Sequence, residues 1–156
     1  MDKLIKLLLT AFDNNFSLYL KSHNYHWTVA GENFKQDHAF LNDIYSDLQD
    51  AIDDYAEQLR RIGAFPKGNF KAITGNSQIE DTQEEVTCSR TMYLNLLADF
   101  DILVTNLQDA FDAATEVREY GLQNFLAERI DEHRKQQWML TASVVDEADY
   151  VVPGTT

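Results

Sequence analysis

The chain contains four histidines that could support metal chemistry, namely His23, His26, His38 and His133. His26 and His38 stand on either side of Ala30-Gly31, where one helical pattern ends before another begins. A turn there would fold two helices into a hairpin and bring the two imidazoles face to face. We recognise no Ser-His-Asp or Cys-His arrangement and no glycine-rich phosphate loop, which disfavours nucleophilic and nucleotide chemistry.

The signature that binds two irons inside a single helical bundle, Glu-x-x-His on each of two helices, is missing. Lys35 stands three residues before His38, and Ile130 stands three residues before His133. The residue three before His26 is another histidine, His23. A di-iron site of that type within one subunit is therefore not expected.

Asn42, Asp53 and Glu57 lie on the same predicted helix as His38 and on the same side of it. Counted from His38 at 100° per residue, the four positions fall at about 0°, 40°, 60° and 100°. His38 and Asp53 are about 22 Å apart along the axis, so one straight helix cannot bring both to a single metal. If two subunits pack these sides antiparallel about a two-fold axis, the acid pair of one meets both histidines of the other. Such a dimer carries two identical intersubunit sites.

Imidazole nitrogen and carboxylate oxygen suit Fe(II), Zn(II) or Mn(II), and open coordination positions would allow chemistry. The spacing alone leaves other interpretations open. A histidine on a helical seam is more often a hydrogen-bonded core residue, and acidic residues on a helix usually face solvent. A plain helical scaffold without any site is also compatible with the pattern.

Four long stretches have the apolar spacing of amphipathic helices. They cover about residues 2–29, 33–62, 81–114 and 122–140. Asn33 and Gln36 have the spacing of a capping box at the start of the second helix. The third helix is predicted to begin at Asp81 or Thr82, and a break near Tyr120-Gly121 separates it from the fourth. With only 6 Gly and 2 Pro in the chain, a fold of many short strands is disfavoured.

Half of these turn-forming residues fall in a predicted connection, residues 63–81, with one helical turn near Ile73 or Ile79. Its nineteen residues could extend to about 60 Å. The helix before it is roughly 45 Å long, so the connection can start the third helix parallel to the second. Two short hairpins joined by one long crossover are the ferritin-like wiring of a four-helix bundle, and we predict this all-α fold.

The 156 residues, 18.0 kDa in mass, are predicted to form a single domain, 1–156, with an irregular C-terminal tail over 144–156. The net charge of −13 repels phosphate backbones and anionic membranes and concentrates cations near the protein. The alternative interpretation is that the acidic surface simply aids solubility. Leu7 to Leu9 is too short an apolar run to span a bilayer, so no membrane association is expected. The lone Cys88 fits a reducing, cytoplasmic setting.

The sequence HNYHWTVAGENF at residues 23–34, followed by His38 and Asp53-x-x-x-Glu57, resembles the Dps family of mini-ferritins. The segment EHRKQQWML at residues 132–140 is similar to that family's last helix. The resemblance spans about residues 4–143. It implies a four-helix subunit with a short helix in the crossover, assembled as a hollow dodecamer. It also implies a ferroxidase site between two-fold-related subunits.

By this resemblance, His26 and His38 of one subunit and Asp53 and Glu57 of its partner bind the metal and act in catalysis. Trp27 resembles the family's tryptophan beside the site, a sink for oxidising equivalents, although it could equally be core filler. The implied function is oxidation of Fe(II) by hydrogen peroxide or dioxygen, with iron storage and protection against oxidative damage. Iron is the expected metal, and zinc is the alternative in the same site.

The chain departs from the family pattern at Asn42, where the family normally has Asp as a ligand to the second metal. An amide offers one weak oxygen ligand without charge, so the second position should be weakened. A metal-binding cage that oxidises iron poorly or prefers zinc is therefore the alternative function.

DNA-binding members usually carry a lysine-rich terminal extension. Here the first helix begins almost at Met1, and the tail from Val144 contains no Lys or Arg. DNA compaction is thus an alternative from another class, and the charge disfavours it.

Overall fold

Five helices account for most of the described part of the chain, residues 1–81 and 85–146 of the computed structural model. They are α1 (Asp2–Thr28), α2 (Phe34–Arg61), α3 (Phe70–Asn76), α4 (Ser89–Val117) and α5 (Tyr120–Val144). Within these residues the only strand-like pairing is an isolated bridge between Ala30 and Cys88. The predicted all-α class is confirmed.

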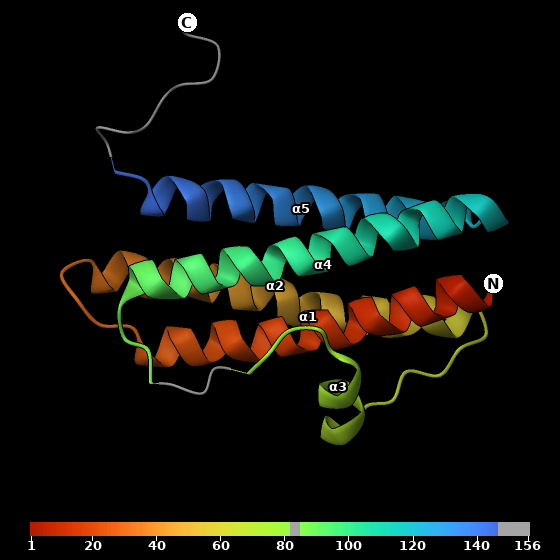
Figure 1. Cartoon of the computed structure of the whole chain (residues 1–156), viewed down its shortest axis with the longest axis horizontal. Helices are drawn as coiled ribbons and strands as arrows, with labels where there is room; N and C mark the ends of the chain where they lie inside the picture. Colours follow the sequence, from red (N-terminus) through yellow and green to blue (C-terminus); the bar gives the residue numbers. More distant parts are fainter. Residues whose placement is uncertain (82–84, 147–156) are drawn as a thin grey trace, which may run out of the picture.

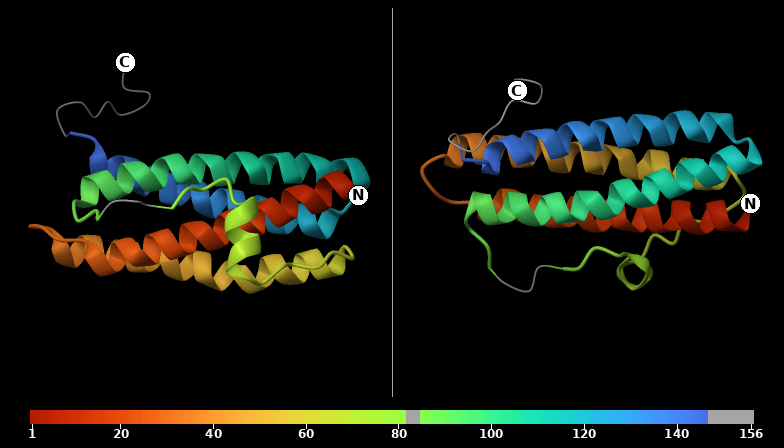
Figure 2. Two further views of the ribbon diagram at one scale, coloured as in Figure 1. Left: turned by 60° about the horizontal axis from the view of Figure 1, so that its bottom comes forward. Right: turned by 45° about the horizontal axis from the view of Figure 1, so that its top comes forward.

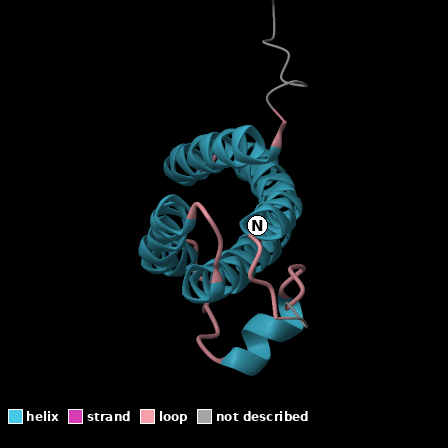
Figure 3. Cartoon of the chain, turned by 90° about the vertical axis from the view of Figure 1, so that its left-hand side faces the viewer, coloured by secondary structure: helices cyan, strands magenta, loops and turns pink. Residues whose placement is uncertain are grey.

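The four long helices surround one apolar core, and α3 lies outside them against α1 (Figures 1 and 3). The helix pairs α1–α2 and α4–α5 form two antiparallel hairpins, and α1 also packs on α4. Each long helix contributes side chains with no exposed surface, for example Leu8, Leu48, Phe100 and Leu126. Each such burial contributes roughly 1.5–3 kcal/mol, and the repeated burial along all four helices sets the bundle.

The connection between α2 and α4 runs back along the bundle, so that α4 starts parallel to α2 (Figures 1 and 2). The predicted ferritin-like wiring is confirmed. The predicted helical turn is α3, around Ile73; Asn69 caps it by accepting a hydrogen bond from the Ala72 amide over 3.0 Å. After α3 the connection is tied to α1, because the buried Asn14 exchanges two hydrogen bonds with Gln78, over 2.7 and 3.0 Å.

The predicted start of the third long helix at Asp81 or Thr82 is wrong. Thr82 lies outside the described residues, but residues 85–87 are described and are not helical, and α4 begins at Ser89. The Thr87 carbonyl accepts a hydrogen bond from the Ala30 amide over 2.9 Å, and the Val86 carbonyl accepts one from Thr28 Oγ1. These contacts hold the segment against the α1–α2 turn in a non-helical form and override its helical spacing.

Asn33 is the N-cap of α2 as predicted, but the capping box is not formed. Its φ and ψ of −99° and 23° differ from the extended conformation of a side-chain cap, and its side chain makes no capping hydrogen bond. The turn is closed by the main chain, with the Phe34 amide donating to the Gly31 carbonyl over 3.2 Å. Gly31 has a φ of 135°, which a glycine adopts most easily.

The break between the last two helices lies at Arg118 and Glu119, two residues before the predicted Tyr120-Gly121. Arg118 is left-handed, with a φ of 61°. Its amide donates to the Thr115 carbonyl and the Glu119 amide donates to the Ala114 carbonyl, which closes the end of α4.

At the C-terminus α5 extends to Val144, and Val145 and Asp146 are not helical. The remainder of the predicted tail, residues 147–156, lies outside the described residues. In the part of the chain that the structure describes, no helix is both long and apolar enough to cross a membrane.

Candidate metal centre

His26 and His38 face each other across the α1–α2 turn, as the sequence predicts. Their rings stack with centroids 3.7 Å apart and an interplanar angle of 22°. His26 belongs to the last turn of α1, and His38 follows the start of α2 by four residues. The turn through Gly31 therefore positions both imidazoles at one end of the bundle.

The two histidines are held by reciprocal hydrogen bonds to the main chain. His26 Nδ1 lies 2.8 Å from the His38 carbonyl oxygen, and His38 Nδ1 lies 2.8 Å from the His26 carbonyl oxygen. A carbonyl oxygen can only accept, so each Nδ1 carries the proton and donates it. In the neutral imidazole this leaves the free lone pair on Nε2, which is the arrangement typical of metal-binding histidines. The pair fits a divalent transition metal.

Asn42 lies one helical turn after His38 on α2 and is half-buried. Its Oδ1 accepts a hydrogen bond from the Tyr45 hydroxyl over 2.9 Å. Amide oxygen is the only atom with which Asn42 could bind a metal, and one of its lone pairs is already engaged. This contact adds to the lack of charge in making Asn42 a weak ligand.

Asp53 and Glu57 lie farther along α2 and do not reach the histidines of the same chain. Both are exposed, and Glu57 pairs with Arg61 at 3.5 Å, with the Glu57 side chain 58% exposed. Among residues 1–81 and 85–146, no group of three or more His, Cys, Asp or Glu side chains could hold a metal ion. Within one subunit, the two histidines and Asn42 therefore lie at one end of the bundle, and Asp53 and Glu57 lie farther along α2.

Trp27 is 59% exposed and is not part of the core of the isolated chain. Its ring lies 4.4 Å from His23, which in turn stacks on Tyr45 at 3.9 Å. Tyr19 completes an aromatic cluster of Tyr19, His23, Trp27 and Tyr45, with its hydroxyl 3.3 Å from His23 Nδ1. Burial and the neighbouring His26 lower the pKa of His23, which favours its neutral form.

The sequence and the fold of the chain resemble those of known proteins. The ferritin-like domain family matches residues 5–148. The DNA protection during starvation protein of Brevibacillus brevis is 30% identical over 80% of this chain and 83% of its own length. The chain belongs to the Dps family of ferritin-like proteins.

Two further comparisons cover most of the chain. General stress protein 20U of Bacillus subtilis is 27% identical over 90% of this chain and 97% of its own length. The crystal structure of a Dps protein from Vibrio cholerae matches with a TM-score of 0.88 and 29% identity, covering 92% of this chain and 90% of that one. The Vibrio protein is described as a member of a superfamily of ferritin-like diiron-carboxylate proteins. Dps-family membership places this chain among the iron-storing, ferroxidase-type mini-ferritins.

A second polar cluster, between α2 and α5, was missed by the sequence reasoning. Asp47 accepts two hydrogen bonds from Arg129, over 2.9 and 2.6 Å, and a third from Gln136 over 3.0 Å. The fully buried His133 is linked to Gln136 at 2.9 Å. The signal was the polar character of His133 at an otherwise apolar position, together with Asp47 beside the apolar stripe of α2.

The electrostatics of this Asp47–Arg129 cluster differ from those of the metal-binding pair. Burial, together with the charge of Arg129, lowers the pKa of His133 to about 4. Burial opposes ionisation of Asp47, but the hydrogen bond and charge of Arg129 outweigh it and lower its pKa. His133 is therefore neutral and Asp47 ionised at neutral pH. Because the Asp47 carboxylate already accepts hydrogen bonds from Arg129, we interpret this cluster as a structural link between α2 and α5.

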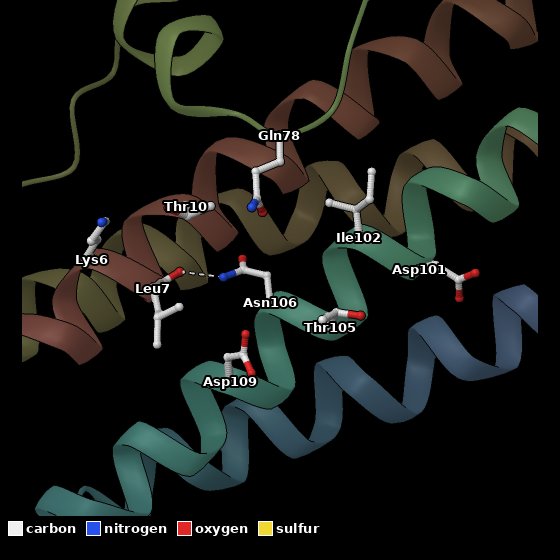
Figure 4. A pocket seen from close by; sticks show the side chains of 9 residues that line it. All are labelled: Lys6, Leu7, Thr10, Gln78, Asp101, Ile102, Thr105, Asn106 and Asp109. Carbon is white, nitrogen blue, oxygen red and sulfur yellow. Dashed lines mark hydrogen bonds between the residues drawn. The ribbon is translucent and has the colours of Figure 1, made fainter.

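The pocket shown in Figure 4 is separate from the histidine pair. It has a volume of about 480 Å³ and lies between α1 and α4, with Gln78 of the crossover above it. The Asn106 amide donates a hydrogen bond to the Leu7 carbonyl across its floor, over 3.2 Å. It shares no residue with the predicted metal site, and Lys6 lines it. We do not assign it to the iron chemistry.

Proposed function

We propose that the protein oxidises Fe(II) with hydrogen peroxide or dioxygen at sites between two-fold-related subunits and stores the product as Fe(III) mineral. His26 and His38 of one subunit and Asp53 and Glu57 of the partner subunit bind the iron. Iron is the substrate, and the electrons it loses reduce the oxidant. Consuming peroxide in this way protects the cell from oxidative damage. The protein contributes ligands, geometry and an acidic shell, while the redox step belongs to the iron.

The observation that carries this proposal is the reciprocal hydrogen bonding of His26 and His38. Both imidazoles are held as the tautomer that leaves Nε2 free to bind a metal. Two neutral nitrogens do not balance the charge of Fe(II), so carboxylates must complete the site. The exposed Asp53 and Glu57 of a second copy supply these carboxylates when that copy packs against the histidine pair.

The surroundings of Asp53 support a second copy as the partner. Asp53 lines a hollow of about 430 Å³ whose other walls include the apolar side chains Phe12, Ile52 and Ala56. Large aromatic side chains are exposed at the histidine end of the bundle, with Trp27 59% and Phe34 44% exposed. Packing that end of the partner subunit into the hollow buries apolar surface and brings the histidines to the acids.

We further propose a closed shell of about 12 subunits, built from these two-fold pairs. Light scattering of the purified protein should give the mass of such an assembly. A sample that contained only the 18.0 kDa monomer would contradict both the shell and the intersubunit site.

Asn42 favours one tightly held iron per site over two. A carboxylate at this position would add a full charge to the second metal position, whereas the amide adds none and already accepts from Tyr45. The same observation supports a second candidate function, a metal-binding cage that oxidises iron slowly or prefers zinc. The two candidates differ in the rate of iron oxidation and in metal preference.

Anaerobic Fe(II) titration, followed by stopped-flow oxidation with peroxide or with oxygen, tests the proposal. We expect one tightly bound iron per subunit, and Asn42→Asp should raise the stoichiometry toward two and quicken oxidation by peroxide. If the natural sequence binds two irons tightly and Asn42→Asp changes neither quantity, Asn42 does not weaken the second metal position. If Zn(II) binds tightly and Fe(II) is not oxidised, the zinc cage is the better account.

The setting we propose is the cytoplasm, where the free, exposed Cys88 would stay reduced. DNA compaction is disfavoured by the net charge of −13.

A further inference from the structure

Tyr45 of α2 is fixed in direct contact with the candidate iron site. Its ring meets that of His26 edge-on, with centroids 5.1 Å apart, and lies nearly parallel to that of His23 at an angle of 13°. Its hydroxyl is held by Asn42. Packing and a hydrogen bond therefore both define the position of this phenol, and tyrosine is among the most easily oxidised side chains.

A site that holds one Fe(II) cannot supply both of the electrons that hydrogen peroxide needs. Reduction of one hydrogen peroxide to two waters takes two electrons, and oxidation of one Fe(II) to Fe(III) supplies one. Two irons in one site would supply both. With one iron and no second donor, cleavage of the O–O bond releases a hydroxyl radical, which is the damage that an iron-storing protein should prevent.

We propose that Tyr45 supplies the second electron and that Asn42 is the positioning residue for its hydroxyl. This inference rests on the proposed function, and on one iron per site in particular. In the balanced step, Fe(II), the Tyr45 phenol, one hydrogen peroxide and one proton give Fe(III), a neutral Tyr45 phenoxyl radical and two waters. The O–O bond breaks, and the phenol proton and one solvent proton complete the waters.

The other rings of the aromatic cluster are placed to share the radical after it forms. The ring centroids of Tyr19 and Tyr45 are 6.5 Å apart. Trp27 is connected to Tyr45 through the ring of His23, which contacts both. Tyr45 is the tyrosine of this cluster that contacts both His26 and Asn42. Because Asn42 stands where a carboxylate is expected, the site lacks the second iron. The hydrogen-bonded Tyr45 then replaces that iron as the second electron donor.

Rapid-freeze electron paramagnetic resonance tests the proposal on the assembled protein, loaded anaerobically with one Fe(II) per subunit and mixed with one equivalent of hydrogen peroxide. We expect a tyrosyl radical and consumption of one Fe(II) per peroxide in the first turnover. Tyr45→Phe should lose most of the tyrosyl signal and release more spin-trapped hydroxyl radical. Tyr120→Phe, which removes a hydroxyl from a side chain that is 68% exposed at the far end of the bundle, should leave both readings unchanged.

Asn42→Asp provides an independent variant, because it should admit a second iron while still accepting the Tyr45 hydrogen bond. Its ratio should rise to two Fe(II) per peroxide, with a weaker radical signal. A ratio of two without a radical in the natural sequence would overturn this inference and leave the proposed function standing. A radical equally strong in Tyr45→Phe would overturn it as well. If peroxide oxidises no Fe(II) at all, the proposed function itself fails and this inference fails with it.

Discussion

His26 and His38 each donate a hydrogen bond from Nδ1 to the main-chain carbonyl of the other, over 2.8 Å in both directions. Each residue thereby orients its counterpart through the backbone as well as through ring stacking. Loss of either imidazole should disturb both Nε2 atoms, so the pair is expected to act as one unit in metal binding.

The first prediction concerns this pair. His26→Phe and His38→Phe keep a flat ring but remove both the Nδ1 donor and the Nε2 ligand. We expect each variant to lower Zn(II) or anaerobic Fe(II) affinity by about 100-fold or more, measured by calorimetry, because a ligand and an orienting contact are lost together. His23→Gln serves as the control and should change affinity only slightly. An equal loss in the control would indicate that His23 is a ligand.

The second prediction concerns the Asp47–Arg129 pair. Its side chains are only 25% and 13% exposed, so Asp47→Asn leaves a largely buried guanidinium without its partner. We expect a loss of about 2–4 kcal/mol in the free energy of unfolding. Glu116→Gln breaks the exposed Lys3–Glu116 pair, whose side chains are 64% exposed, and should cost less than about 1 kcal/mol. Urea unfolding of both variants measures the difference, and equal losses would contradict the assignment of Asp47 to a buried link.

The third prediction concerns pH. The pKa of His133 is lowered to about 4 in the folded protein, whereas in an unfolded chain it is about 6.5. The unfolded state therefore binds the proton more readily, and the stabilising effect of neutral His133 is complete above about pH 6.5 and is lost as the pH falls toward 4. The neutral state fits the contacts, since His133 Nδ1 donates to Gln136 and Nε2 faces Arg129 at 3.4 Å.

Urea unfolding of the metal-free protein at several values between pH 7 and pH 4 measures this effect. The free energy of unfolding should fall across this range, with a His133 contribution of up to about 3 kcal/mol. His133→Gln should be less stable at pH 7 but should lose less stability on acidification. An identical pH dependence in this variant would show that other groups control the acid response.

The fourth prediction is the lack of DNA binding. With 26 acidic and 13 basic residues, the protein should not retard plasmid DNA in a gel at neutral pH and about 0.15 M salt. The assay must exclude divalent cations, which could bridge two anionic surfaces. Retardation under these conditions would require a local basic surface that the charge balance does not suggest.

Much of the fold could be predicted from the sequence, because long amphipathic helices have a strong periodic signal and the length of the crossover limits the wiring. The helix ends were less predictable. Val86 fits the apolar spacing of α4, yet its carbonyl accepts from Thr28, a contact between segments far apart in the chain. Such tertiary contacts leave no local sequence signal.

In the candidate site, too, some features could be predicted from the sequence and others could not. The facing of His26 and His38 could be predicted from the turn between two helices. The contacts of Tyr45 with Asn42 and His26 could not, because at its position on α2 a tyrosine is indistinguishable from core filler. Its hydrogen bond to Asn42 becomes evident only when both side chains have coordinates, although their spacing of three on a helix is compatible with contact.

The intersubunit site is the central claim, and mixed assemblies test it most directly. One variant, His26→Phe with His38→Phe, lacks the histidines, and the other, Asp53→Asn with Glu57→Gln, lacks the acids. Each alone should form the assembly and oxidise Fe(II) very slowly.

The decisive measurement is the rate of peroxide-dependent Fe(II) oxidation after the two variants are co-assembled in equal amounts. If each site takes its histidines from one subunit and its acids from the partner, random mixing leaves about a quarter of the sites intact, and about a quarter of the wild-type rate should return. If all ligands came from one chain, every site would remain broken. A mixed assembly no more active than the separate variants would contradict the account.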